Sequence, residues 1–141
     1  MPYISQKSRK DLDCNIRSPQ NAGELNYKLT TICLAYLKDH TNYQGYNDVF
    51  GALYGVISRQ PLFRFDDNTP LGCLNKELWD TEFAYQKDTY SRGMDGIQFG
   101  NYIRGAVIGC LLELYRRAAA PYEDGKIKEN GEVYPTGNQN R

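Results

Sequence analysis

The residues best suited to chemistry lie between positions 99 and 134. An apolar segment in this stretch includes Phe99 and Asn101 near its start and ends on the adjacent cations Arg116 and Arg117. An arginine can bind a phosphate through two parallel hydrogen bonds. An aromatic ring beside an amide side chain can stack on a base and recognise its edge. These residue types predict a site that holds an anion against a ring system.

Three further cations lie next to apolar segments and are candidates to assist: Lys28, Arg59 and Arg104. Each candidate residue also has a structural explanation. Cations in the last turn of a helix interact favourably with the helix dipole, and asparagine is a good residue for capping the start of a helix. The sequence alone leaves both explanations open.

Arg116 and Arg117 are expected to differ in role. Adjacent residues of a helix point about 100° apart, so the two side chains do not face one ligand equally. We expect one arginine to reach an anion. The other is expected to pair with Glu113 or with the acidic pair Glu123 and Asp124.

The chain is poorly equipped for catalysis or metal binding. It has a single histidine, His40, and lacks the glycine-rich phosphate loops, the nucleophile-elbow pattern and the zinc-protease pattern. Its four cysteines are scattered, with no pair at the short spacing typical of metal sites. We therefore expect a binding protein rather than an enzyme, with no metal and no cofactor.

The bulk composition narrows the class further. A chain of 141 residues is typical of one domain, and its formal net charge of zero argues against general attraction to nucleic acid. No apolar run approaches the roughly 20 residues of a membrane span, and the polar N-terminal segment lacks a signal-peptide pattern. We expect a cytosolic protein. Its 12 tyrosines suggest interfaces or ligand pockets, although a polar core is an equally good explanation.

Apolar periodicity predicts a mainly helical α+β domain. The expected helices cover 5–13, 22–39, 48–59, 74–91 and 101–120. Short strands near 62–65 and 97–99 are expected to form a minor antiparallel element. Pro121 is expected to end the last helix. Residues 1–134 are expected to form one ligand-binding domain, followed by a disordered tail at 135–141.

Two segments share the pattern G-A-x-x-G, at 51–55 and 105–109. Small residues four apart lie on one face of a helix and allow another backbone to approach closely. Glycine inside a helix costs about 1 kcal/mol relative to alanine, so a close contact is expected in return. This contact is either between these two helices or across a dimer axis, and we slightly favour a subunit interface.

Three segments resemble a family of small phage proteins: MPYIS at the N-terminus, GELNYKLT at 23–30 and ELYRRAAAPYEDGKIKENGEVY at 113–134. These are the anti-defence sponges that counter Thoeris immunity by sequestering its signal, a cyclic ADP-ribose isomer. The resemblance implies a ligand held without hydrolysis in pockets at a dimer interface, within the cytoplasm of the infected bacterial host. Some members are hexamers that also bind cyclic dinucleotides or trinucleotides. A dimer or a dimer-based hexamer is therefore expected.

The resemblance also implies site residues. The basic positions of the two longer motifs are Lys28 and one of Arg116 and Arg117, while Phe99 and Asn101 fit the aromatic and amide roles. The two ends of the last helix are about 24 Å apart by helical rise, too far for one small nucleotide within one chain. We therefore expect a pocket shared by two antiparallel copies. The alternative function is that of a nucleic-acid-binding phage accessory protein.

Overall fold

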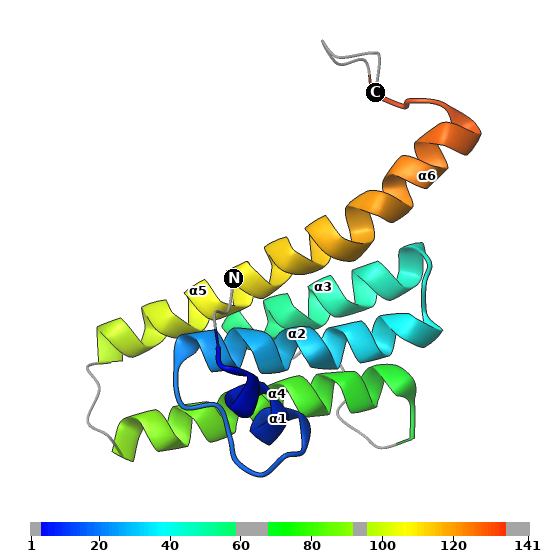
Figure 1. Ribbon diagram of the computed structural model, residues 1–141. Coiled ribbons are helices and arrows are strands. Elements are labelled where there is room, and N and C mark those ends of the chain that lie inside the picture. The colour runs from blue at the N-terminus through cyan, green and yellow to red at the C-terminus, as the bar shows by residue number, and fades with distance from the viewer. Residues whose placement is uncertain (1–3, 59–67, 92–95, 135–141) are drawn as a thin grey trace.

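The computed structural model describes residues 4–58, 68–91 and 96–134, which form a bundle of helices (Figure 1). In chain order these are α1 (Gln6–Asp13), α2 (Ala22–Asp39), α3 (Tyr43–Ser58), α4 (Pro70–Ser91) and α5 (Gly96–Leu114). A π-helical segment, η1 (Tyr115–Ala119), and then α6 (Ala120–Asn130) continue α5 without a break. α6 extends beyond the bundle (Figure 1).

The helical expectations are largely confirmed, but the expected β element is not. No strand occurs in the described ranges, and residues 97–99 lie inside α5. The glycines at 96 and 100 suggested a break there, yet both are helical. The other expected strand, at 62–65, and the tail at 135–141 lie outside the described residues.

α2 is the central element of the bundle and packs against α1, α3, α4 and α5. Its start is fixed by Asn21, whose side chain accepts a hydrogen bond from the Glu24 amide at 2.9 Å. Its apolar residues recur at helical spacing and are buried: Leu25, Leu29, Ile32, Cys33 and Leu37. Burying one such leucine or isoleucine stabilises the fold by about 1.5–3 kcal/mol.

The contact between α2 and α5 includes a buried polar group. Asn26 is 6% exposed, and its Nδ2 donates to the carbonyl oxygen of Ala106 at 2.9 Å. Gly109 leaves room for this amide, because a Cβ at that position would lie 2.7 Å from Asn26 Nδ2. A Cβ on Gly105 meets nothing within 4 Å among the described atoms. One glycine of the second G-A-x-x-G segment therefore serves packing within the chain, and the other lies on an open face.

The expected helix end at Pro121 is wrong. In an α-helix the proline ring clashes with the carbonyl four residues earlier, which here belongs to Arg117. The π turn directly precedes the proline, and the Ala120 amide bonds to the Tyr115 carbonyl five residues earlier. We attribute the continuity of the helix to this wider turn. It departs from the α-helical hydrogen-bond pattern just before Pro121, where that pattern would produce the clash.

The start of α2 is also tied to the preceding loop by an ion pair. Glu24 is 5% exposed, and its two carboxylate oxygens accept hydrogen bonds from Arg17 at 2.6 Å and 2.9 Å. Oε1 also accepts from the Gln20 amide at 2.9 Å. The hydrogen bonds from Arg17, followed by that from Gln20, lower the pKa of Glu24 despite its burial.

The first prediction compares the two glycines of α5. For the monomer, measured at protein concentrations too low for association, Gly105→Ala is expected to raise the free energy of unfolding by about 0.5–1 kcal/mol, because alanine favours helix and the site is open within one chain. Gly109→Ala is expected to lower it by about 1–2 kcal/mol, because Asn26 must move and lose its bond to Ala106. Urea denaturation at several protein concentrations measures both effects. Stabilisation by both substitutions would contradict the Asn26 contact.

The second prediction concerns pH. The pKa of Glu24 is lowered in the folded state, so its stabilisation is present above the ordinary value of 4.5 and is lost as pH falls through the folded value. Glu24→Gln is expected to destabilise the fold by about 1–3 kcal/mol near pH 7. The difference from the parent protein should shrink towards pH 3. The control is Glu77→Gln on the exposed surface of α4, expected to change stability by less than about 0.5 kcal/mol.

Candidate functional site

The two C-terminal arginines lie on η1 and share one carboxylate. Arg117 Nε donates to Glu113 Oε2 at 2.6 Å, and Arg116 Nη2 donates to the same oxygen at 3.1 Å. The expectation that only one arginine pairs with an acid is therefore wrong. Arg116 and Arg117 follow Glu113 by three and four residues, so the helix places both cations next to the same carboxylate.

The shared carboxylate is the least exposed member of this cluster. The Glu113 side chain is 14% exposed, whereas Arg116 and Arg117 are 62% and 50% exposed. The hydrogen bond from Arg117 is the largest cause that lowers the pKa of Glu113, and Arg116 adds to it. Two positive charges around one negative charge leave this cluster net positive, so it remains suited to an anion.

The opposite end of α5 carries Asn101 and Arg104, both exposed. The Arg104 guanidinium lies against Gly100, where an added Cβ would be 3.2 Å from Nη2. Exposed apolar side chains run along α5 past these residues and into η1, and we call them the outer stripe: Ile97, Ile108, Leu112 and Tyr115. Their spacing places them on one side of the helix, and Gly105 lies among them. One exposed face therefore joins the two ends of α5.

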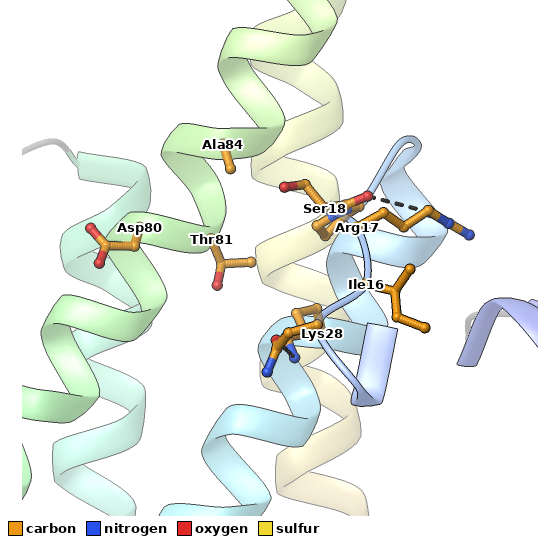
Figure 2. Close-up of a pocket in the computed structure, with 9 residues that line it drawn as sticks. Ile16, Arg17, Ser18, Lys28, Asp80, Thr81 and Ala84 are labelled. Carbon is orange, nitrogen blue, oxygen red and sulfur yellow. Dashed lines mark hydrogen bonds between the residues drawn. The ribbon is translucent and has the colours of Figure 1, made fainter. Parts of the chain in front are cut away.

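The remaining predicted residues are not brought together with the arginine pair. Lys28 lines a different hollow, of about 360 Å³, between the loop before α2 and one face of α4 (Figure 2). Its Nζ donates to the Leu12 carbonyl at 2.8 Å and to Asn15 Oδ1 at 2.9 Å, so it holds the end of α1. Arg59 lies outside the described residues. Phe99 is in the first turns of α5, and its side chain is outside the described part.

Sequence reasoning missed a groove beside Arg117, between η1, α1 and α2. Its volume is about 220 Å³, and the residues that line it are Arg9, Asn26, Tyr27, Thr30, Thr31, Leu34, Glu113 and Arg117. Asn26 had a detectable signal, because it shares the buried face of α2 with Leu29 and Cys33 and is polar. Arg9 had none, because the position of α1 depends on tertiary packing.

Other kinds of site are less well supported. In the described ranges, no group of three or more histidine, cysteine or acidic side chains is arranged to hold a metal ion. None of the helices described combines the length and the apolar character needed to cross a bilayer.

Residues 1–61 and 86–133 match the family described as Domain of unknown function (DUF6899). These ranges cover more than half of the chain, which therefore belongs to this family. They include η1, the outer stripe and the groove, whereas residues 62–85, with most of α4, lie outside the match. No curated protein and no solved structure matches the chain.

The third prediction tests the shared carboxylate. Because Arg117 makes the shorter contact with Glu113, Arg117→Gln is expected to raise the pKa of Glu113 more than Arg116→Gln does. Carbon-detected NMR titration of the Glu113 carboxyl measures both shifts. Equal shifts, or a larger one for Arg116→Gln, would contradict the observed pairing. Lys126→Gln on α6 is the control for removal of a distant positive charge.

Proposed function

We propose that this member of the DUF6899 family binds and sequesters a cyclic ADP-ribose-type signal, without cleaving it, in pockets shared by two copies of the chain. The observation that carries the proposal is the outer stripe. It connects Asn101 and Arg104 at one end of α5 with Arg116 at the other, along one exposed face. The resemblance to the phage sponges supplies the class of ligand.

The outer stripe supports association of two copies. Ile97, Leu112 and Tyr115 are 79%, 65% and 51% exposed, so this face carries apolar area that water solvates poorly. A two-fold axis requires a self-complementary surface. Two antiparallel copies of α5 meet that requirement, and the open space at Gly105 allows their backbones to come close. A dimer, or a hexamer built from such dimers, follows from the proposal.

Antiparallel pairing also completes the ligand site. It brings the Asn101 and Arg104 end of one copy beside the Arg116 end of the other. The two cations bind the diphosphate of the signal, and the amide binds the edge of adenine. Phe99 is proposed to stack on the base. Lys28 and Arg59 are proposed as assisting cations, with Lys28 the weaker because its ammonium already bonds to the end of α1.

The proposed pocket acts by affinity alone. A scarce signal must be held tightly, and a nanomolar dissociation constant corresponds to about −12 kcal/mol. Charge-assisted hydrogen bonds and stacking in a pocket closed by two subunits are the proposed sources of this free energy. The ligand is expected to be released unchanged when the protein is denatured by heat. Recovery of a cleaved product would instead indicate an enzyme.

The fourth prediction tests whether the pocket is shared. Asn101→Ala and Arg116→Gln are each expected to lose capacity for glycocyclic ADP-ribose, measured by equilibrium dialysis. After subunit exchange of an equal mixture, we expect about one quarter of the original capacity, because half of the dimers are mixed and each mixed dimer has one intact pocket. No recovery after exchange confirmed by mass spectrometry would refute the shared pocket.

Two controls accompany this experiment. Lys38→Gln, at the exposed end of α2, is expected to bind like the parent protein. Light scattering must give at least twice the 16.2 kDa chain mass, and a monomer at micromolar concentration would contradict the proposal.

The alternative function is tested with single-stranded and duplex DNA. Binding that weakens steeply with added salt would favour a nucleic-acid-binding protein.

A further inference from the structure

The groove beside Arg117 has features of a binding site that the outer stripe does not use. All of its walls come from one chain, namely from α1, α2 and the junction of α5 with η1. Its volume of about 220 Å³ is below the roughly 300–1,000 Å³ of pockets for drug-sized ligands. The groove is therefore suited to a small molecule or to one part of a larger one.

Two guanidinium groups in the groove have donors to spare. Arg117 is held by Glu113 through Nε, and within the described ranges its terminal Nη1 and Nη2 groups have no hydrogen-bond partner. The Arg9 side chain has neither a hydrogen bond nor an ion pair in the same part of the chain. A guanidinium fixed at one edge presents its other edge in a set direction, which suits bidentate binding of an oxyanion such as phosphate.

Asn26, which lines the groove, carries a buried acceptor that lacks a donor among the described residues. This acceptor is Oδ1 of its side-chain amide. The orientation of the amide is fixed, because only Nδ2 can donate to the Ala106 carbonyl. A buried acceptor without a partner is costly, so a ligand whose hydroxyl group reaches this oxygen gains affinity.

We propose that this groove binds a small phosphate monoester that carries hydroxyl groups, such as a sugar phosphate. Arg9 and Arg117 bind the phosphate, and Asn26 accepts a hydrogen bond from a ligand hydroxyl. The nearby Glu113 carboxylate does not repel the anion strongly, because Arg116 and Arg117 neutralise it. The site needs no second copy of the chain and is separate from the pocket proposed above.

The fifth prediction is tested by measuring the binding of three probes to the intact protein: ribose 5-phosphate, inorganic phosphate and ribose. Isothermal titration calorimetry is expected to rank their affinities in that order, because only the first supplies both the anion and the hydroxyl groups. Arg9→Gln is expected to weaken the affinity for ribose 5-phosphate by about tenfold or more. The matched control is Lys10→Gln, the next residue of α1, which removes the same charge but does not line the groove.

Three results would overturn the proposal: no heat or NMR shift change with ribose 5-phosphate at millimolar concentration, equal losses in Arg9→Gln and Lys10→Gln, or equal affinities for ribose 5-phosphate and inorganic phosphate. Asn26→Ala is expected to weaken the affinity for ribose 5-phosphate and leave the affinity for inorganic phosphate unchanged. If that variant unfolds, the comparison of Arg9→Gln with Lys10→Gln still tests the proposal. Asn101→Ala is expected to keep sugar-phosphate binding, and Arg9→Gln is expected to keep the capacity for glycocyclic ADP-ribose. Each of the two proposed sites can therefore be refuted without the other.

Discussion

The contact between α2 and α5 is the interaction on which the positions of the functional residues depend. Asn26 reaches across to the Ala106 carbonyl through the space left by Gly109, and this fixes the rotation of α5 about its own axis. With that rotation set, Ile108 and Leu112 face outward. The same register places Arg117 beside α2. This polar contact acts together with the buried apolar residues of α5, such as Val107 and Leu114, to determine which face of α5 is exposed.

The π-helical segment adds a second constraint at the end of this helix. If the α-helical register continued through Pro121, the proline ring would clash with the Arg117 carbonyl. The wider turn carries the helix past the proline and holds Arg116 and Arg117 on the same side as Glu113. π turns inside α-helices are frequent at functional sites. Here the distortion and the cationic cluster occupy the same residues.

Much of the helical structure could be predicted from local signals. The bounds of α2 follow from its cap at Asn21 and its apolar periodicity, both local properties of the chain. The helix through 97–99 was missed because the neighbouring glycines are poor helix formers, and tertiary packing overrides that preference. The end at Pro121 was misjudged because a change of helical register cannot be seen in residue types. The arginine pair could be identified from the sequence. The hydrogen bonds of both arginines to Glu113, and the position of Arg9 in the same groove as Arg117, depend on three-dimensional packing.

The distance along the chain between the two halves of the central contact has a consequence for biosynthesis. Asn26 and Ala106 are 80 residues apart. At a translation rate of about 5–20 residues per second, α2 emerges roughly 4–16 s before the segment that covers it. During that time the nascent chain presents the α5-facing side of α2 to solvent. This side of α2 is therefore a surface on which a chaperone or another nascent chain can bind before α5 is made.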